Sequence, residues 1–192
     1  QIYEHIKNQV KKGEKLIGNV RKLSHLEEQQ TKISAVNLIP LLERAINSIL
    51  DTYHEKKIHL IREYEEQSTF TVVGNDFLFD VFKNLLINAV KHNDSEEIEI
   101  IIKISKQKKD VSAYIRVEII DNGRGISDDQ KKTIADLFDE ENNGSKRIGM
   151  GLSIVKQVIN RFNGEIWVED RVEGDPSKGS IFVLFLRQAN RS

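Results

Sequence analysis

The sequence of 192 residues contains no cysteine. Disulfides, thiolate metal sites and a cysteine nucleophile are therefore excluded, and the composition suits a reducing compartment. The sequence also lacks any apolar run near the ~18 residues that cross a bilayer, and no signal-peptide pattern opens it. We therefore expect a cytoplasmic location, with no membrane contact by this segment.

A large excess of charge of one sign is also missing. The 29 basic and 30 acidic residues give a formal net charge of -1. This balance argues against nucleic acid or an anionic membrane as the main partner. The length allows one compact domain plus an accessory element. Because Gln1 stands where a complete protein has Met, we expect a fragment of a longer chain.

The first 30 residues differ in composition from the rest, being rich in Lys, Glu, Gln and Asn. Their apolar residues recur with a near-heptad rhythm, which predicts one long amphipathic helix: Ile6, Val10, Leu16, Ile17, Val20 and Leu23. A coiled-coil or helical-hairpin arm is favoured over an ordinary surface helix, because the stripe is narrow and Gly13 and Gly18 weaken an isolated helix. Residues 31–37 are predicted to form a linker.

The remaining sequence alternates between helical and strand patterns. Apolar periodicity predicts helices at about residues 38–55, 76–92, 128–138 and 149–162. Strands are predicted at 57–62, 69–73, 97–105, 111–120, 164–170 and 180–187, with a hairpin turn in the charged segment 106–110. The polar residues 139–147 are predicted to be a mobile loop.

The helix predicted at 76–92 carries an unusual polar face. Asp80, Asn84, Asn88 and Lys91 share one side at ~100° per residue, opposite an apolar stripe made by Leu78, Phe82, Leu85, Leu86 and Ala89. Asparagine is a poor helix former, so two of them one turn apart suggest a ligand rather than a solvated surface. Amide oxygens can bind Mg²⁺ together with substrate phosphates, and Lys91 adds a positive charge.

Two glycine segments accompany this helix. DNGRGI at 121–126 follows an apolar strand, so a flat base could approach its turn and donate an exocyclic amine hydrogen bond to Asp121. RIGMGLSIVKQV at 147–158 places Gly149 and Gly151 at a helix start, where free N–H groups favour phosphate. A common Asp-Asn-Gly turn and an ordinary helix start remain alternatives. Neither the P-loop nor the dinucleotide-binding fingerprint is present.

Taken in order, these segments resemble the ATP-binding catalytic domain of sensor histidine kinases, from the superfamily shared with gyrase, Hsp90 and MutL. NLLINAVKHN at 84–93 resembles the family's N box, and DNGRGI resembles its first glycine box. LFD at 137–139 resembles part of its F box, GMGLSIVK at 149–156 its second glycine box, and GSIFVLF at 179–185 its last glycine segment. The second aromatic residue of the F box is missing.

The resemblance implies an α+β fold, a two-layer α/β sandwich with a mixed sheet of the Bergerat type, plus an N-terminal helical arm. Residues 1–35 are expected to be part of the second helix of a dimerisation and phosphotransfer hairpin, and residues 36–192 the catalytic domain. The parent would be a homodimeric two-component sensor that phosphorylates a response regulator, and this segment its cytosolic part, whether or not the parent is anchored in a membrane.

The resemblance also implies a role for each site residue. Asn88 would be the Mg²⁺ ligand, and Asn84 would lie beside the metal and the γ-phosphate of ATP. Lys91 would contact phosphate, and His92 would take the position of a side chain that lies against the nucleotide. Asp121 would bind adenine, and Ser180 would position Asp121 through its hydroxyl group, with or without a water. The remaining expected ATP-binding residues shape the base pocket, cradle the phosphates or anchor the lid: Gly123, Gly125, Ile126, Gly149, Met150, Gly151 and Leu152.

Position 84 separates branches of the superfamily. Gyrase, Hsp90 and MutL have glutamate there as the general base for hydrolysis, whereas an amide cannot accept that proton. Positioning and electrostatics suffice for phosphoryl transfer to a delivered acceptor. We therefore expect catalytic roles for Asn84 and Asn88 in transfer of the γ-phosphate.

The phosphoacceptor is not evident in the sequence. The family's acceptor motif has His followed by an acidic residue, with Pro a few residues on, and neither His5 nor His25 has that context. Residues 1–30, ending in KLSHLEEQ, resemble the helix that follows the acceptor helix, so the acceptor is expected on an upstream helix absent from this chain. A serine/threonine kinase of the same superfamily and a nucleotide-sensing interaction module without transfer activity are the alternatives.

Overall fold

The computed structural model describes residues 32–65, 68–109, 111–138 and 150–189, together with Val10 and Gly18. The predicted N-terminal arm and the predicted loop at 139–147 lie outside the described residues, apart from those two positions. The elements in chain order are β1 Ser34–Asn37, α2 Leu38–Thr52, β2 Lys57–Glu63, β3 Thr71–Gly74, α3 Phe77–Lys91, β4 Glu97–Lys109, β5 Ser112–Asp121, α4 Asp128–Phe138, α5 Met150–Arg161, β6 Glu165–Val172 and β7 Asp175–Arg187.

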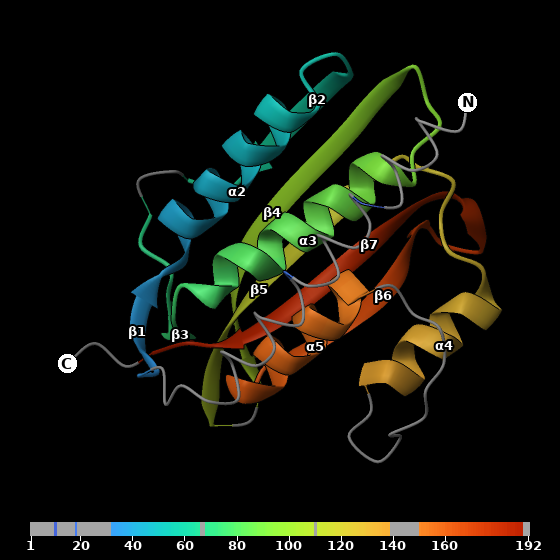
Figure 1. Cartoon of the computed structure of the whole chain (residues 1–192). Helices are drawn as coiled ribbons and strands as arrows, with labels where there is room; N and C mark the ends of the chain where they lie inside the picture. Colours follow the sequence, from blue (N-terminus) through green and yellow to red (C-terminus); the bar gives the residue numbers. More distant parts are fainter. Residues whose placement is uncertain are drawn as a thin grey trace.

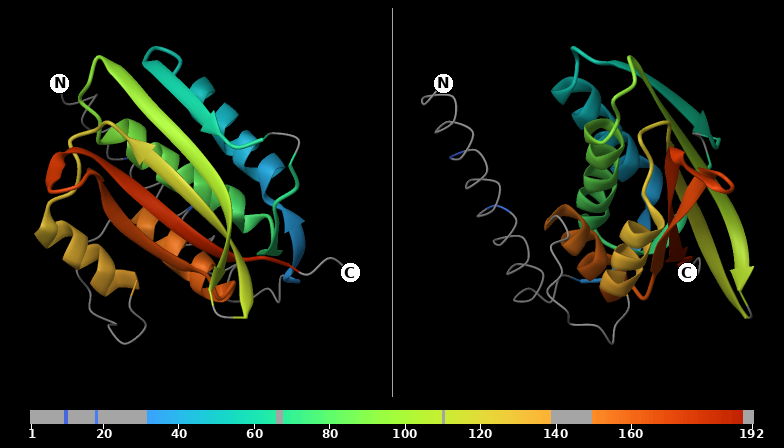
Figure 2. Two further views of the ribbon diagram at one scale, coloured as in Figure 1. Left: turned by 180° about the vertical axis from the view of Figure 1, so that it is seen from behind. Right: turned by 90° about the vertical axis from the view of Figure 1, so that its right-hand side faces the viewer.

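One five-stranded sheet, in the order β2-β4-β5-β7-β6, forms the main layer. Strands β2 and β4 run parallel, and every other neighbouring pair runs antiparallel, so the sheet is mixed. Helices α2, α3 and α5 lie side by side on one face of this sheet, with α3 in the middle (Figures 1 and 2). The predicted α+β two-layer sandwich with a mixed sheet is therefore confirmed.

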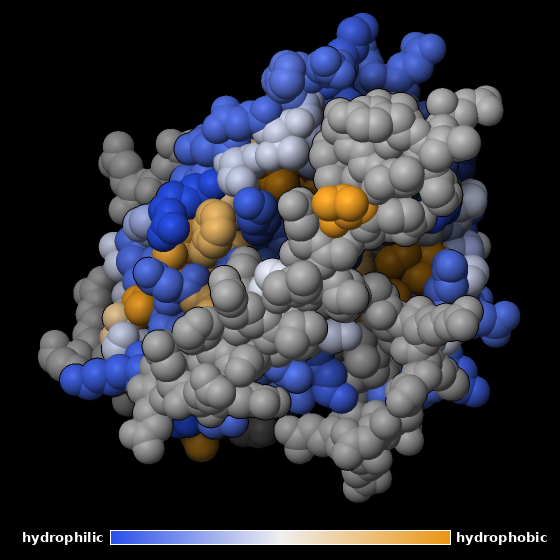
Figure 3. Space-filling view, viewed as in Figure 1, coloured by the Kyte–Doolittle hydropathy of each residue, from blue (hydrophilic) through white to orange (hydrophobic). Residues whose placement is uncertain are grey.

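The alternation of side chains along β4 explains how the two layers join. Ile98, Ile100 and Ile102 are almost completely buried under the helices, whereas the residues between them face outwards. The apolar stripe of α3 lies on these isoleucines as part of one continuous core. Hydrophilic side chains cover the outer surface around the connection from α2 to β2 (Figure 3). No helix within the described residues is long and apolar enough to cross a membrane.

The predicted linker at 31–37 is wrong over its second half. Ser34–Asn37 forms β1, which pairs antiparallel with β3 from Ser34 opposite Gly74 to Asn37 opposite Thr71. Asn37 then caps α2 by accepting a hydrogen bond from the backbone of Ile39 at 3.3 Å. A strand of four residues is too short to show a period, and its partner is distant in sequence.

The hairpin predicted between 97 and 120 is present, but its first strand, β4, runs four residues further than predicted. The charged segment expected to turn is still paired, with Lys106 opposite Ile115 and Lys109 opposite Ser112. Side chains 105–109 are exposed, so the strand continues through them without burying their charges. A prediction from polarity alone therefore places the turn too early in the sequence.

Candidate nucleotide-binding site

Helix α3 presents its asparagines away from the core. The predicted apolar stripe is buried, together with Val81 and Val90, whereas Asn84 and Asn88 are only partly buried. Lys91 occupies the exposed last turn and His92 is the C-cap residue. The predicted common polar face is confirmed, and its amides are accessible to a ligand from the helix side that does not face the sheet.

Asn84 and Gly151 lie directly against each other. The Asn84 side chain donates from Nδ2 to the Asp80 carbonyl at 2.9 Å, which orients the amide and leaves Oδ1 as an acceptor. A Cβ atom at Gly151 would lie 2.9 Å from Asn84 Oδ1, closer than a real Cβ contact allows. Glycine at 151 therefore lets the first turn of α5, whose N–H groups have no acceptor within the helix, approach the polar face of α3.

Asp121 is the last residue of β5 and is only 6% exposed. Its Oδ1 accepts the Gly123 N–H at 2.8 Å, and its Oδ2 accepts the Ser180 hydroxyl at 2.7 Å. The predicted contact between Ser180 and Asp121 is therefore present, without a bridging water. These bonds fix the carboxylate in one orientation at the end of the strand.

Burial is the main influence on the Asp121 carboxyl and raises its pKa above the ordinary value. The Ser180 hydroxyl, the backbone N–H groups of Gly123 and Ser180, and the charge of Arg171 oppose that rise by stabilising the anion. A buried acceptor surrounded by donors suits recognition of a neutral N–H group, since no counter-charge has to be buried with it.

Two glycines shape the chain around Asp121. At Gly179, φ is +112° and a Cβ would lie 2.0 Å from the Asp121 carbonyl oxygen. At Gly125, φ is +69° and a Cβ would lie 1.5 Å from the Pro176 carbonyl oxygen. Both positions therefore require glycine. Gly125 was predicted as a site residue, whereas Gly179 was not, although it directly precedes Ser180 in the last glycine segment.

His92 contacts the turn that follows Asp121. Arg124 lies 2.9 Å from the Nδ1 atom of His92 through Nη2, and its backbone N–H donates to the His92 carbonyl at 3.3 Å. Burial, then the charges of Arg124 and Lys91, lower the pKa of His92. The imidazole is thus favoured in its neutral form, with Nδ1 accepting from the guanidinium.

The other predicted site residues are described to different extents. Ile126 and Leu152 are partly buried and pack against the core. Met150 begins α5, but its side chain and all of Gly149 lie outside the described residues. The turn at 123–126 contacts His92 through Arg124, and the start of α5 contacts Asn84 in the middle of α3 through Gly151.

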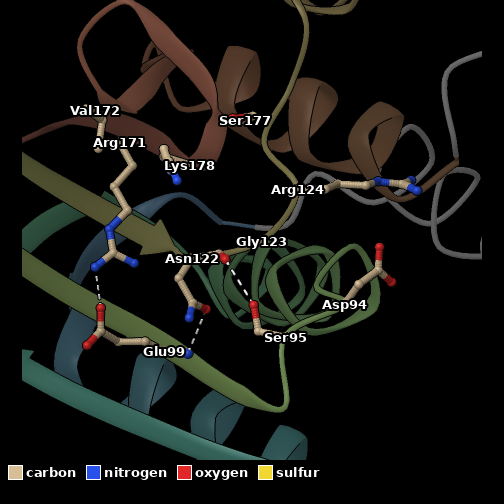
Figure 4. Close-up of a pocket in the computed structure, with 10 residues that line it drawn as sticks. All are labelled: Asp94, Ser95, Glu99, Asn122, Gly123, Arg124, Arg171, Val172, Ser177 and Lys178. Atoms are coloured by element: carbon tan, nitrogen blue, oxygen red, sulfur yellow. Dashed lines mark hydrogen bonds and ion pairs between the residues drawn. The ribbon is translucent and has the colours of Figure 1, made fainter.

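A cavity of about 670 Å³ borders the turn after β5 at residues 122–124 (Figure 4). Of the predicted ATP-binding residues, only Gly123 lines it. An ion pair between Arg171 and Glu99 crosses its wall, and Asn122 contacts Ser95 and Glu99 there (Figure 4). Asn84, Asp121 and the residues of α5 are not among those that line this cavity.

A resident metal cage is not formed by the described residues. They contain no group of three or more His, Cys, Asp or Glu side chains that could hold a metal ion. A divalent cation near α3 would have to depend on amide oxygens and on phosphates brought by a ligand, which is a common way to bind Mg²⁺.

Comparison with known proteins identifies the fold. Residues 74–190 match the family model described as histidine kinase-, DNA gyrase B- and HSP90-like ATPase. The chain belongs to this ATPase family. It is 31% identical over 185 residues to the sensor-like histidine kinase ycf26 of Porphyra purpurea, covering 90% of this chain and 27% of that protein.

Further relatives and structures agree with this family. The adaptive-response sensory kinase SasA of Crocosphaera subtropica is 25% identical over 97% of this chain and 48% of its own length. The structure of full-length ShkA in complex with AMPPNP superposes with a TM-score of 0.68 at 21% identity, covering 94% of this chain and 38% of that one. The chain thus spans between about a quarter and a half of these curated relatives, and it contains an ATP-binding domain of the histidine kinase type.

Proposed function

We propose that this chain is the catalytic core of a two-component sensor histidine kinase and transfers the γ-phosphate of ATP to a histidine on a separate helix. The contact between Asn84 and Gly151 carries the proposal, because it brings the asparagine helix against the segment expected to hold phosphate. The relatives named as a sensor-like histidine kinase and a sensory kinase support the same reaction.

In this proposal the adenine base binds at one end of the site and the phosphates bind at the other. Asp121, held by Ser180 and Gly123, accepts the exocyclic amine of adenine. Gly125 and Ile126 line the base, His92 lies against the nucleotide, and Lys91 contacts phosphate. Gly149, Met150, Gly151 and Leu152 form the phosphate and lid segment. Asn88 supplies an amide oxygen to Mg²⁺, which neutralises phosphate charge when bound.

Asn84 distinguishes transfer from hydrolysis. Its Nδ2 already donates to the Asp80 carbonyl, so the atom that faces the start of α5 is an amide oxygen. An amide oxygen orients a hydrogen-bond donor but cannot act as a general base at neutral pH. The site therefore favours phosphoryl transfer to a delivered nucleophile over activation of water.

The phosphoacceptor is expected to come from another part of the full protein. Among the described histidines, His54 contacts the Asp51 carbonyl at 3.1 Å, His59 lies 3.7 Å from Glu97, and His92 contacts Arg124. His54 is followed by Glu55, but none of the three has the proline of the acceptor motif a few residues on. Dimerisation, an acceptor helix in the same or the partner subunit, and a response regulator are parts of this proposal.

The decisive experiment uses the chain extended upstream and incubated with ATP labelled on the γ-phosphate. We expect a protein phosphate that acid removes and base does not, together with slow release of free phosphate. The same protein carrying Asp121→Asn is the control and should remain unlabelled. Phosphoserine or phosphothreonine would identify the serine/threonine kinase alternative. Tight ATP binding without any label would identify a nucleotide-sensing module.

A further inference from the structure

Buried polar side chains are rare in the described part of the chain, and they cluster. Asp121 and Ser180 are 6% and 4% exposed and belong to the proposed site, whereas Asn93, at 3% exposed, has no assigned role. A buried amide is costly unless its hydrogen bonds are made. The contacts of Asn93 therefore indicate what it does.

Asn93 joins the end of α3 to the turn after β5. It follows the C-cap residue His92, and its Nδ2 donates to Asn122 Oδ1 at 2.7 Å. Its own Oδ1 accepts the backbone N–H of Ser95 at 3.0 Å, which fixes the amide orientation. The two asparagines therefore form a direct side-chain link between the segment that carries Asn84 and Asn88 and the residue next to Asp121.

The side chain of Asn122 bonds to the backbone of β4 in the way that the backbone of a strand residue does. Ladder pairing between β4 and β5 ends at Ile100 opposite Asp121. Beyond it, Asn122 Oδ1 accepts the Glu99 N–H at 2.8 Å, and Nδ2 donates to the Glu97 carbonyl at 3.0 Å. The backbone N–H of Asn122 also donates to the Glu99 carbonyl at 3.3 Å. A side-chain amide has the same donor and acceptor as a peptide group, so the Asn122 side chain extends the pairing beyond this last main-chain bond.

Because the Asn122 side chain makes these bonds, the main chain can leave the sheet at Asn122, after its N–H. The main-chain carbonyl of Asn122 turns towards Ser95, whose hydroxyl donates to it at 3.3 Å. Gly123 then packs so tightly that a Cβ would lie 2.8 Å from both Asp121 Oδ1 and the His92 carbonyl oxygen. The position of Asp121 relative to α3 thus depends on the amide pair and on glycine at 123.

We propose that Asn93 and Asn122 are positioning residues that hold Asp121 in register with the asparagine face of α3. Their side chains bond to each other and to the backbone of residues 95, 97 and 99. Their amides fix where the Asp121 carboxylate lies relative to Asn84 and Asn88. This distance decides whether one nucleotide can bind Asp121 with its base and the asparagines with its phosphates. This inference rests on the proposed role of Asp121 in binding adenine.

Base discrimination is the readout that separates positioning from general stability. Inosine triphosphate has a carbonyl oxygen where ATP has the amine, so it places an acceptor against Asp121. If Asp121 is misplaced, the variant binds ATP no more tightly than inosine triphosphate. A variant that is less stable but still folded keeps its preference for ATP. Affinities for both nucleotides should be measured by calorimetry with Mg²⁺, at a temperature where circular dichroism shows each variant folded.

We expect Asn93→Ala and the isosteric Asn93→Asp to lower the ratio of ATP to inosine triphosphate affinity by about fivefold to tenfold. Asn93→Asp keeps the acceptor for Ser95 but puts two oxygens face to face at Asn122. Asn75→Ala is the matched control, because Asn75 Oδ1 accepts the Phe77 N–H at the opposite end of α3. It should reduce stability and leave the ratio unchanged.

The outcomes distinguish this inference from the assignment beneath it. If the unmodified chain binds both nucleotides equally, the role of Asp121 is wrong. If the unmodified chain prefers ATP and the folded Asn93 variants keep the full preference, the positioning role is overturned. Should Asn93→Ala fail to fold, Asn93→Asp and Asn122→Asp, which keep the side-chain volume, are judged by the same ratio.

Discussion

The base end and the phosphate end of the proposed site differ in how their polar groups are satisfied. At the base end, Asp121 accepts the Ser180 hydroxyl and the Gly123 N–H, and the Asn93–Asn122 pair holds the turn beside it. At the phosphate end, the described residues show no hydrogen bond from the side chains of Asn88 or Lys91. Within the part of the chain that the structure describes, the Asn84 side chain bonds only within its own helix, to the Asp80 carbonyl.

This difference shows where the ligand is needed. The base end is held by hydrogen bonds within the protein itself, so adenine binding requires little rearrangement there. The asparagine face, by contrast, carries amides and an ammonium group that a metal ion and phosphates would satisfy. Substitutions at the base end should therefore affect recognition of every adenine nucleotide, whereas those at the phosphate end should depend on metal and phosphate.

The largest expected effect comes from Asp121→Asn. It replaces the acceptor for the adenine amine by a mixed donor and acceptor, and ATP affinity should fall by at least about a hundredfold. Calorimetry with ATP and with adenosine should show comparable losses, since the base is their common part. Tight ATP binding by this variant would refute the assignment of the base end.

The same variant tests the cost of burying Asp121. Because the pKa of Asp121 is raised on folding, its contribution to stability is complete below the ordinary value of 3.8 and is lost as pH rises through the higher folded pKa. Ligand-free Asp121→Asn should therefore gain stability relative to the unmodified chain between acidic and neutral pH. Urea unfolding at pH 4 and pH 7 would show this, and a gain that shrinks towards neutral pH would contradict it.

At the phosphate end, Gly151→Ala should have the next largest effect. The new methyl group would lie 2.9 Å from Asn84 Oδ1, so α5 or the Asn84 amide must move. We expect ATP affinity to fall by about tenfold or more, and adenosine affinity to change little. Ser153→Ala, on the same helix, is the control.

The second substitution Asn84→Ala, added to Gly151→Ala, should relieve the collision. Thermal unfolding should show the double variant to be more stable than Gly151→Ala alone, although ATP affinity stays low because Asn84 is gone. A double variant with strictly additive losses of stability would show that Gly151 and Asn84 do not meet in solution.

The elements that carry the site could be predicted because their signals are local. The apolar stripe of α3 repeats every turn, so the opposite side had to present Asn84 and Asn88. The contact of Ser180 with Asp121 came from the family resemblance, since the two residues are 59 positions apart and no local pattern links them.

The rest depends on pairings that no local pattern contains. The strand β1 exists because its backbone pairs with β3, and its four residues show no period of their own. Asn93 and Asn122 stand inside recognised motifs, but a buried amide and a solvated one look alike in a sequence. Gly179 is required by the carbonyl of Asp121, a contact that only the fold creates.

A smaller and more selective effect is expected at Asn88. Removing its amide oxygen in Asn88→Ala should weaken Mg-ATP by about tenfold, while ATP measured with a chelator should weaken by no more than about twofold. Titrations with and without Mg²⁺ provide the test, and Lys132→Ala on α4 is a charge-changing control distant in sequence. Equal losses under both conditions would contradict a metal role for Asn88.

The smallest expected effect is that of Ser180→Ala, because the backbone N–H groups of Gly123 and Ser180 still stabilise the Asp121 carboxylate. Loss of one hydroxyl donor should cost about 1 kcal/mol, or about fivefold in ATP affinity. Without that donor the pKa of Asp121 rises further, so the protonated form, which accepts the amine less well, appears at a higher pH. The affinity difference from the unmodified chain should therefore widen as pH falls from neutral towards acidic values. Calorimetry across that range decides the point, since a constant difference would mean that Ser180 acts on the base end through packing alone.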